Sequence, residues 1–477
     1  MDDTNDLMEI RRQKLETLRA KNAAPYGQRF DRTANIAGVR ELFAEGKSMN
    51  VAGRLTAHRD MGKSHFLDLS DGTGRIQIYL NSKAFSAEQW EIFQLLDLGD
   101  FLGVEGECFL TKTGEPSIKV HTFTVLSKAL RPMPAKWHGL SDVETRYRQR
   151  YLDLLANPES REVFEKRITI VREIRRFLED RGFLEVETPM MQSIAGGAAA
   201  RPFQTHHNAL NLDLFLRIAP ELYLKRLLVG GFDKIFEMNR NFRNEGISRR
   251  HNPEFTMLEA YWAYADFEQM AELMEELICH LSMKINGTLK LEHKNADGEV
   301  VRTINLERPW KRARYMDLIR GVDPEWFERD LDGKRAKCRE LGVEISPAME
   351  EFEITQQIFE KRIEEKSFDP LFVTHVPKEL VPLAKQNPED PRLVDVYELV
   401  INGQEISPGY SELNDPQVQR ERLEHQAGEE TQNLDEDFLT ALEHGMPPAG
   451  GLGLGIDRLV MMLTGAESIR DVILFPQ

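Results

Sequence analysis

Residues 234–265 form two runs of alternating apolar and polar side chains, joined by a loop rich in Gly, Asn and Arg. Because alternate residues of a strand point to opposite faces, a hairpin would gather one polar set on a connected surface. That set contains Arg243, Glu245, Phe255, Glu259 and Tyr261. With Arg250 and His251 in the loop, its cations suit a phosphate-bearing ligand. The alternative is that these charges are only the solvated face of an antiparallel sheet.

A second unusual string, GGLGLGIDR, lies near the C-terminus. Gly451, Gly453 and Gly455 fall on one face of the expected strand, so this face would be a flat floor for a planar ring. Arg458 follows where a helix is expected to begin. A dinucleotide-binding fingerprint is excluded, because its third glycine would fall at Ile456.

Three segments, in this order, resemble the three motifs of the class II aminoacyl-tRNA synthetases. A helical apolar stripe over residues 164–178, followed by a strand that Pro189 ends, resembles motif 1, which builds a dimer interface. FRNEG and RHNPEFTMLE, within residues 242–259, resemble motif 2, and GGLGLGIDR resembles motif 3. The sequence from about residue 48 to the C-terminus is most similar to the bacterial lysyl-tRNA synthetases.

This resemblance implies a lysine–tRNA ligase. Such an enzyme activates L-lysine with ATP to lysyl-adenylate and pyrophosphate, and then transfers lysine to the 3′ end of tRNA(Lys). Adenylate formation is in-line attack of a carboxylate on the α-phosphate, so it needs charge stabilisation and positioning more than an enzyme base. The resemblance implies that Arg243 and Arg458 are the catalytic residues, with Arg243 bridging the substrate carboxylate and the α-phosphate.

The implied ATP site combines cationic, aromatic and glycine residues. Phe255 and Arg458 would sandwich the adenine, with Glu245 near its amino group. Arg250 and His251 would hold the outer phosphates. The full set is Arg243, Glu245, Arg250, His251, Phe255, Glu398, Glu405, Gly451, Gly453, Gly455 and Arg458.

Magnesium is the expected cofactor. Glu398 and Glu405 lie seven residues apart around the turn of VINGQ and match the metal-binding carboxylates of the family. Magnesium bound by two carboxylates and substrate phosphates is chemically reasonable, with up to three ions accompanying ATP.

A lysine substrate carries two ammonium groups, so its pocket should be acidic. By resemblance, Glu221 would bind the α-amino group, Glu412 and Tyr261 the ε-ammonium, and Gly197 would offer a backbone carbonyl. The full lysine-binding set is Gly197, Glu221, Arg243, Glu259, Tyr261 and Glu412. An unpaired buried carboxylate facing a neutral analogue would give strong discrimination.

Two positions depart from the family pattern. Pro408 stands where the family usually has an asparagine that touches the substrate carboxylate, and Val381 stands where a serine is usual. Proline has no side-chain donor, so holding the carboxylate would rest more on Arg243. Neither change reaches the expected ε-ammonium pocket, so lysine remains the expected substrate.

Residues 48–130 contain short alternating strands with one helix after the third strand, which is the order of an OB-fold barrel. Side-chain parity turns Phe66 and Gln77 outward, near Arg59, where they could stack on and read unpaired bases. In the family this barrel reads the anticodon, and the matching residues are Arg59, Phe66, Gln77 and Glu115. The alternative is that Phe66 only covers a barrel end.

The expected fold class is α+β, with an N-terminal five-stranded OB-fold barrel and a class II synthetase core in which helices flank an antiparallel sheet. The expected parts are a helical extension over 1–47, the anticodon-binding barrel over 48–130, a linker or hinge over 131–155, and the catalytic domain over 156–477. A helical insertion is expected at about 285–390 in the catalytic domain.

Composition is compatible with these expectations. The 477 residues carry a net charge of −17, but residues 1–150 hold 22 Lys and Arg against 20 Asp and Glu, so tRNA could dock there without an adverse regional charge. The three cysteines are far apart, and no apolar run is long enough for a membrane span, so we expect a cytoplasmic protein without a membrane partner. The motif 1 resemblance implies a homodimer.

Three alternatives stay open at this point. An aspartyl- or asparaginyl-type relative shares the barrel and the core, but an acidic substrate would need a cation where Glu412 stands. A lysine-transferring relative that modifies a protein would lack the N-terminal barrel. A non-catalytic RNA-binding relative would have lost Arg243 and Arg458.

Overall fold

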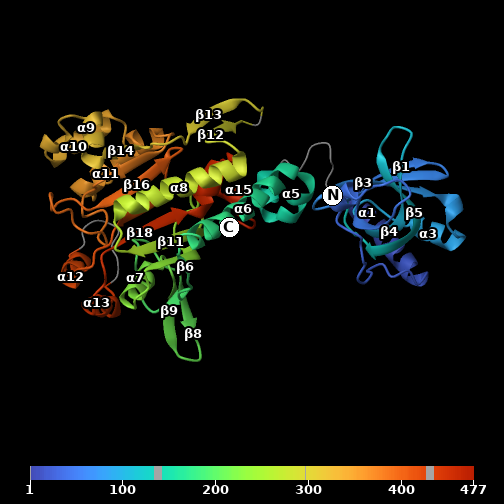
Figure 1. Cartoon of the computed structure of the whole chain (residues 1–477), viewed down its shortest axis with the longest axis horizontal. Coiled ribbons are helices and arrows are strands. Elements are labelled where there is room, and N and C mark those ends of the chain that lie inside the picture. The colour runs from blue at the N-terminus through green and yellow to red at the C-terminus, as the bar shows by residue number, and fades with distance from the viewer. Residues whose placement is uncertain (1, 134–141, 296, 426–433) are drawn as a thin grey trace. The chain divides into compact units, whose positions relative to one another are not determined.

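The computed structural model describes the chain except for residues 1, 134–141, 296 and 426–433. The chain divides into two compact units, Met1–Gly139 and Leu140–Gln477 (Figure 1). Part of the expected linker, 134–141, lies outside the described residues. None of the helices in the described residues combines the length and apolar character that a membrane span requires.

Five strands of the first unit close into a barrel in the order β1-β2-β3-β5-β4, which confirms the predicted OB-fold. They are β1 (Ser48–Met61), β2 (Ser64–Asp71), β3 (Gly74–Asn81), β4 (Phe101–Leu110) and β5 (Pro116–Ser127). Helix α3 (Ala87–Gln94) follows β3 and begins at a capping box formed by Ser86. Leu67 and Leu69 are fully buried, so the residues between and beside them on β2, including Phe66, are turned away from the barrel core.

Two helices precede the barrel, α1 (Asp2–Ala20) and α2 (Ile36–Glu41). Leu18 of α1 is fully buried, and Arg11 donates a hydrogen bond to the Leu98 carbonyl oxygen at 3.1 Å. Helix α1 therefore packs against the residues that lead into β4.

An eight-stranded sheet forms the centre of the second unit, in the order β14-β15-β16-β17-β18-β11-β10-β6. All neighbouring strands are antiparallel except the two outermost pairs, which are parallel. The bounds are β6 (Leu184–Glu185), β10 (Lys234–Phe242), β11 (Glu254–Ala263), β14 (Lys311–Arg314), β15 (Leu371–Thr374), β16 (Val396–Ile401), β17 (Gln404–Ser411) and β18 (Ala449–Gly455). The two predicted motif strands, β11 and β18, are direct neighbours in this sheet.

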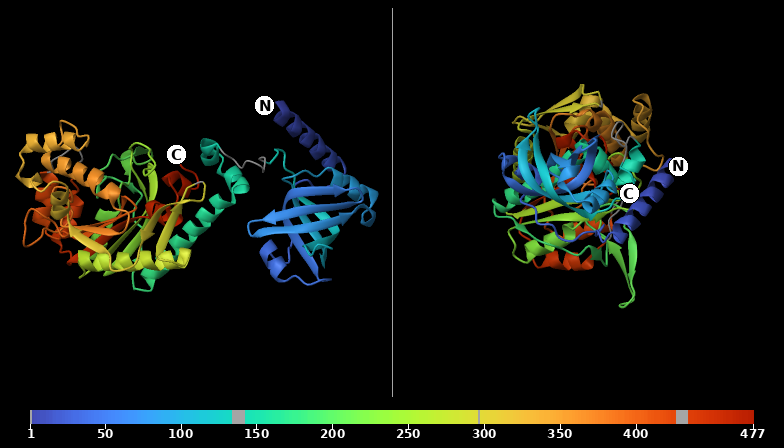
Figure 2. Two further views of the ribbon diagram at one scale, coloured as in Figure 1. Left: turned by 90° about the horizontal axis from the view of Figure 1, so that it is seen from above. Right: turned by 90° about the vertical axis from the view of Figure 1, so that its right-hand side faces the viewer.

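Helices α6 (Pro158–Glu179), α8 (Phe267–Asn286) and α14 (Ile456–Thr464) pack on one face of the sheet (Figures 1 and 2). The core between the sheet and these helices contains Ile174, Phe236, Leu258, Met274 and Leu454. Because even-numbered residues of β11 and β18 enter this core, their odd-numbered residues point to the opposite face. Within the predicted stripe of α6, Phe164, Ile174 and Leu178 are buried, whereas Ile168 is 63% exposed.

Residues 285–390, expected as a helical insertion, contain both helices and strands. The helices α9 (Tyr315–Val322), α10 (Leu331–Glu340) and α11 (Glu351–Arg362) enclose a core with Tyr315, Trp326 and Phe359. The strands are the hairpin β12 (Lys290–Lys294) and β13 (Val300–Asn305), together with β14 and β15 of the main sheet.

Shorter elements complete the second unit. They are α4 (Val143–Arg148), α5 (Arg150–Ala156), β7 (Met191–Gln192), β8 (Gln204–His207), β9 (Leu212–Leu216), α7 (Glu221–Val229), α12 (Pro416–Glu424), α13 (Glu436–Glu443) and α15 (Ile469–Val472). Strands β7, β9 and β8 form a separate three-stranded sheet.

Candidate active site

The register of β10, β11 and β18 places the predicted motif residues side by side. Asn241 pairs with Phe255, so Arg243 follows directly beyond the end of β10 next to that ring. On the other edge of β11, Glu259 pairs with Gly453 and Tyr261 with Gly451. The hairpin predicted from alternation is thus confirmed, and its polar face continues onto the glycine face of β18.

A cavity of about 190 Å³ opens on this face where the hairpin loop, β17 and α14 meet. Eight residues of the predicted ATP set line it: Arg243, Glu245, Arg250, His251, Phe255, Glu405, Gly455 and Arg458. The guanidinium carbon of Arg243 lies 5.2 Å from the centre of the Phe255 ring. The lining therefore combines cations, an aromatic ring and bare backbone, which suits a nucleotide.

Arg458 lies in the first turn of α14 and is fixed by two contacts. Its Nη1 donates to the Glu405 carbonyl oxygen at 2.9 Å, and its Nη2 lies 3.2 Å from His251 Nε2, which must accept. His251 Nδ1 is 2.8 Å from Ser248 Oγ. Burial, followed by the Arg458 charge, lowers the pKa of His251, so this ring is neutral at pH 7.

Arg243 keeps donors available for a ligand. Its buried Nε has no hydrogen-bond partner among the described residues. Burial lowers the pKa of its guanidinium, whereas Glu245, Glu405 and Glu259 act in the opposite direction. An arginine remains charged in such a setting, so this side chain offers an incompletely compensated cation to the cavity.

Four glutamates cluster beside the nucleotide cavity. Glu398 of β16 is next to Glu405 of β17, and burial followed by Glu405 raises the pKa of Glu398 well above its ordinary value. Two further carboxyls, Glu360 and Glu364, come from α11 and the turn after it. Glu405 N donates to Glu364 Oε1 at 2.8 Å, and burial together with Glu405 raises the pKa of Glu364 to about 7.

Glu360 and Glu364 were not among the predicted site residues. They belong to the segment 285–390, in which no chemistry was visible, and only tertiary packing brings them to the predicted metal-binding pair. Closely spaced carboxylates repel one another, and a divalent cation would relieve this repulsion. Glu398 and Glu405 therefore fit the predicted magnesium site.

A buried acidic pocket adjoins the nucleotide cavity at the other end of β11 and β18. Glu221, Glu259 and Glu412 have exposed fractions of 5%, 5% and 1%. Tyr261 Oη donates to Glu259 Oε2 at 3.1 Å, and Tyr410 Oη donates to Glu221 Oε1 at 2.7 Å. The predicted lysine-binding glutamates thus meet in one buried site.

Gly451 is required by this pocket rather than by the nucleotide cavity. A Cβ atom at Gly451 would overlap Glu412 Oε1 and would lie 2.8 Å from the Tyr261 ring. Further along β18, a Cβ at Gly453 would meet Met257 Cε at 2.8 Å and Pro408 Cγ at 3.6 Å. The glycine face therefore serves both halves of the site, although the sequence analysis assigned it to a planar ring alone.

Tyr410 and Lys225 are two pocket residues that the sequence analysis did not name. Lys225 lies one turn after Glu221 on α7, and its Nζ is 2.7 Å from Glu221 Oε1 and 2.5 Å from Glu412 Oε2. The i to i+4 spacing of Glu221 and Lys225 was a local signal for this pair, but nothing local indicated that Glu412 would join it.

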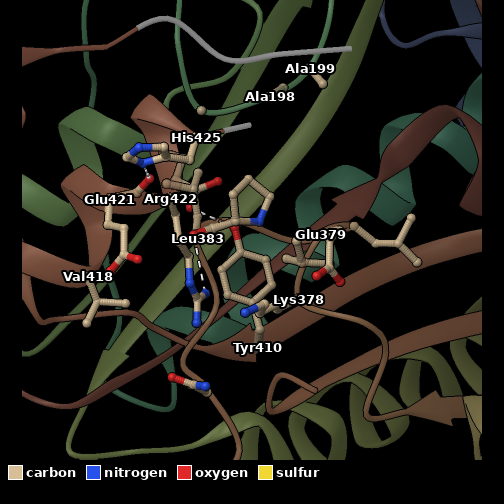
Figure 3. Close-up of a pocket in the computed structure, with 16 residues that line it drawn as sticks. Ala198, Ala199, Lys378, Glu379, Leu383, Tyr410, Val418, Glu421, Arg422 and His425 are labelled. Atoms are coloured by element: carbon tan, nitrogen blue, oxygen red, sulfur yellow. Dashed lines mark hydrogen bonds between the residues drawn. The ribbon is translucent and has the colours of Figure 1, made fainter. Parts of the chain in front are cut away.

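A larger cavity of about 560 Å³ lies beyond Glu221 and Tyr410. Figure 3 shows Tyr410 between the 378–383 loop and side chains of α12. Gly197 lines this cavity with a φ of +85°, and a Cβ there would lie 3.1 Å from Glu221 Cβ. Gly197 is thus next to the acidic pocket, as predicted.

The predicted anticodon residues lie on neighbouring strands of the barrel. Arg59 pairs with Phe66 across β1 and β2, and Arg59 Nη2 donates to buried Asp68 at 2.6 Å. Phe66 is half-buried against Tyr79, with ring centres 5.0 Å apart. Gln77 pairs with Asp68 across β2 and β3.

The remaining predicted residue, Glu115, joins this face through arginine. Arg75 bridges Asp68 at 2.9 Å and Glu115 at 3.7 Å. Asp68 and Tyr79 were not predicted, because alternation alone does not say which outward residues contact one another. The result is an aromatic pair beside a charged network, on one surface.

This fold and this site are those of a class II tRNA synthetase with an appended OB-fold. Residues 142–477 match the family described as tRNA synthetases class II (D, K and N), and residues 49–126 match the OB-fold nucleic acid binding domain. Relatives named lysine–tRNA ligase cover nearly the whole chain. That of Pelotomaculum thermopropionicum is 51% identical, covering 100% of this chain and 95% of its own.

Two further relatives carry the same name. The Syntrophomonas wolfei protein is 50% identical, covering 99% of this chain and 97% of its own length. The Carboxydothermus hydrogenoformans protein is 51% identical, covering 99% of this chain and 98% of its own length. The chain belongs to the lysine–tRNA ligase family of class II synthetases.

Proposed function

We propose that the protein activates L-lysine with ATP to lysyl-adenylate and transfers lysine to the 3′ end of tRNA(Lys). The observation that carries this proposal is the Glu412 carboxylate. It is 1% exposed, its Oε1 has no hydrogen-bond partner among the described residues, and it adjoins the arginine-lined cavity. A buried acceptor of this kind favours a substrate that supplies a cationic donor, because a neutral substrate would leave it unpaired.

The nucleotide half supports adenylate formation. Phe255 and Arg458 flank the cavity where adenine would stack, and Arg250 and His251 lie where outer phosphates would be held. Arg243 lies between the nucleotide cavity and Glu259, so it can contact both the α-phosphate and the substrate carboxylate. Fixed cations at these places would stabilise charge as the carboxylate attacks and pyrophosphate leaves.

Glu398 and Glu405 are the residues that would hold magnesium. When bound, the ion would neutralise charge on the phosphates and on the leaving pyrophosphate. The raised pKa of Glu398, caused by burial and then by Glu405, fits a pair that is incomplete without a cation. We therefore include magnesium, in up to three ions with ATP, in the proposal.

The acidic half supports lysine as the substrate. Glu221, in the first turn of α7, would bind the α-amino group, and Glu412 with Tyr261 would bind the ε-ammonium. Gly197 would offer its carbonyl. Pro408 lines the nucleotide cavity and provides no side-chain hydrogen-bond donor, so Arg243 would be the residue that binds the substrate carboxylate.

The barrel supports tRNA rather than a protein as the acceptor of lysine. Phe66 offers a half-buried ring for stacking, and Arg59, Gln77 and Glu115 offer polar groups beside it. Such a surface suits unpaired anticodon bases. A tRNA(Lys) transcript with altered anticodon bases should be charged less efficiently than the natural one.

We also propose that the protein acts as a homodimer in the cytoplasm. Ile168, Leu184 and Met191, at 63%, 55% and 55% exposure, come from the segment that resembles motif 1, and their burial would favour pairing. The three cysteines are unpaired thiols, as a reducing compartment would keep them. Sedimentation of the wild type and of Ile168→Asp tests the dimer, since the variant should shift toward the monomer.

ATP–pyrophosphate exchange across the twenty amino acids tests the activity. We expect exchange with lysine alone, followed by lysine-dependent charging of tRNA(Lys). Equal exchange with aspartate or asparagine would contradict the choice of substrate. Absence of exchange with every amino acid would favour a non-catalytic role.

A further inference from the structure

Lys225 places a cation inside a pocket that is otherwise built of acids and tyrosines. Its side chain is fully buried, and its Nζ lies 2.7 Å from Glu221 Oε1, 2.5 Å from Glu412 Oε2 and 3.3 Å from the Leu383 carbonyl oxygen. A buried ammonium is tolerated only when it is paired. Both of its acidic partners are residues that the proposed function assigns to the substrate's own ammonium groups.

The two oxygens of Glu412 lie in different surroundings. Oε2 forms the ion pair with Lys225 Nζ at 2.5 Å, whereas Oε1 points toward the bare backbone of Gly451, and neither oxygen has a hydrogen bond of good geometry among the described residues. A carboxylate held by one oxygen keeps the other in a fixed direction. The free oxygen is therefore positioned before any substrate enters.

Electrostatics explains why the pocket needs this internal cation. Burial, together with Glu221, raises the pKa of Glu412 to about 8 even though Lys225 lowers it. Without the ammonium, the remaining influences all favour the protonated carboxyl, which is a poor acceptor for a cationic tail. For Lys225 itself, burial lowers the pKa, but the two carboxylates outweigh burial and the pKa lies above its ordinary value.

We propose that Lys225 is a positioning residue for amino-acid recognition, an inference that rests on the lysine activation proposed above. Its ammonium bridges Glu221 and Glu412, holds both carboxylates in place, and makes Glu412 easier to ionise when the ε-ammonium of the substrate binds. Selection of a substrate with a cationic tail thus depends on a cation that the protein itself supplies.

The other groups that face the pocket do not replace Lys225. Tyr261 and Glu259 face it from β11, and Tyr410 faces it from β17. Burial raises the pKa of both tyrosines well above its ordinary value, so both are neutral. Arg243 faces Glu259 from the nucleotide side and would be engaged by the substrate carboxylate and phosphate.

Lys225→Met tests the inference, because methionine retains most of the buried volume without the charge. We expect the KM for lysine in exchange to rise at least about tenfold at pH 7.5, with the KM for ATP nearly unchanged. This increase in the lysine KM should be larger at pH 6.5 than at pH 8.5, because at the lower pH the bound lysine must displace a proton from Glu412, and that proton is held more tightly in Lys225→Met. Lys225→Arg keeps the charge, so its lysine KM should follow the wild-type pH profile even if its affinity is lower.

Lys334→Met is the matched control. Lys334 is also a buried lysine, with 2% side-chain exposure, and it pairs with Glu351 in the 285–390 segment, away from the acidic pocket. Both Met variants should lose stability, but only Lys225→Met should change the lysine KM and its pH profile. Equal effects of the two variants would assign Lys225 a structural role and overturn the inference.

Calorimetry of lysine binding, repeated in buffers with different ionisation enthalpies, counts the protons released. Lys225→Met should release more protons per lysine bound at pH 8.5 than the wild type, by up to about three-quarters of a proton, because the wild-type carboxyl, with a pKa of about 8, is mostly ionised at that pH. The same count in both proteins would overturn the inference while leaving lysine activation intact. If the wild type neither binds lysine nor exchanges with it, the proposed function fails, and the inference fails with it.

Discussion

The nucleotide cavity and the acidic pocket share strands β11, β17 and β18, but they hold charge in different surroundings. In the nucleotide cavity, Arg243 and Arg458 are half-buried, and Arg243 Nε has no partner among the described residues. In the acidic pocket, Glu221 and Glu412 are almost fully buried and share the ammonium of Lys225. The nucleotide cavity thus depends on a ligand for its counter-charge, whereas in the acidic pocket Lys225 already supplies part of the counter-charge.

This difference follows from what each half must recognise. ATP brings a polyanion and its own metal ions, so half-buried arginines can bind it without a large desolvation cost. An amino-acid side chain brings one charge, and discrimination of that charge is strongest where water is excluded. Burying two carboxylates together would cost too much without Lys225, which explains a lysine side chain in a pocket that is proposed to bind lysine.

The largest effect is expected on the nucleotide side, for Arg243→Ala. Loss of a fixed donor to the developing charge should lower lysine-dependent exchange by about 10²–10³-fold. Arg249→Ala removes an exposed cation from the same loop and should have little effect. Comparable losses in the two variants would show that the loop provides only a general positive field.

A methyl group added on β18 at position 451 should affect the acidic pocket and leave the nucleotide cavity unchanged. Gly451→Ala places a Cβ against Glu412 Oε1 and the Tyr261 ring, so we expect the lysine KM to rise by roughly 10–100-fold, as for a loss of about 1–3 kcal/mol, while the ATP KM is nearly unchanged. Gly455→Ala has contacts no closer than 3.7 Å, so it should leave the lysine KM as it is. Steady-state exchange measures both constants, and a higher ATP KM in Gly451→Ala would contradict the division.

Changes in the barrel should affect neither the nucleotide cavity nor the acidic pocket. Phe66→Ala removes a stacking surface and should lower kcat/KM for tRNA charging by roughly 10–100-fold, because one base stack is worth about 1–3 kcal/mol. Amino-acid exchange, which needs no tRNA, should be unchanged. Phe101→Ala, on another half-buried barrel aromatic beneath Arg54, is the control and should alter charging much less.

The pH dependence of the wild type should differ between the halves. Burial raises the pKa of Glu412 to about 8, so the accepting carboxylate is protonated in the free protein at lower pH. The lysine KM should therefore fall as the pH rises from 6 toward 8, by up to about tenfold per unit. The ATP KM should not follow the same curve, and parallel curves would mean that a group common to both halves is titrating.

The smallest effect is expected for Glu364→Gln, beside the proposed magnesium ligands Glu398 and Glu405. Burial and Glu405 raise the pKa of Glu364 to about 7 from its ordinary value of 4.5, so the folded state is destabilised most above pH 7, where this buried carboxyl must be charged. Without magnesium, the variant should melt a few degrees above the wild type at pH 8.5, and the difference should become small by pH 5 and vanish below pH 4.5, under both pKa values. Calorimetric melting curves at the two pH values check the sign.

Much of the architecture could be predicted because its signals are local. Period-two alternation predicted the β10–β11 hairpin, and parity predicted the outward side of Phe66 in the barrel. The glycine face of β18 was also visible in the sequence, but its division between Glu412 and the nucleotide cavity was not. Ile168 belongs to the predicted helical stripe and lies between buried Phe164 and Ile174, yet it is 63% exposed, because periodicity defines a face of the helix and not what covers each residue on it.

The residues that were missed depend on distant partners. Lys225 acquires its role from Glu412, 187 positions later along the chain, and Tyr410 from Glu221. Glu364 reaches Glu405 from the segment 285–390, which carried no motif. Local sequence holds no information about such approaches, because they are set by how separate elements pack.

The sequence by itself determined which chemical groups this protein carries, on which strands they lie and in which direction they alternate, because strand periodicity and glycine content are properties of neighbouring residues. Tertiary structure decided which of those groups are buried and which meet. Burial and proximity set the charge state of Glu412, Glu364 and Lys225, since both desolvation and Coulomb interactions depend on distances that only the folded chain defines.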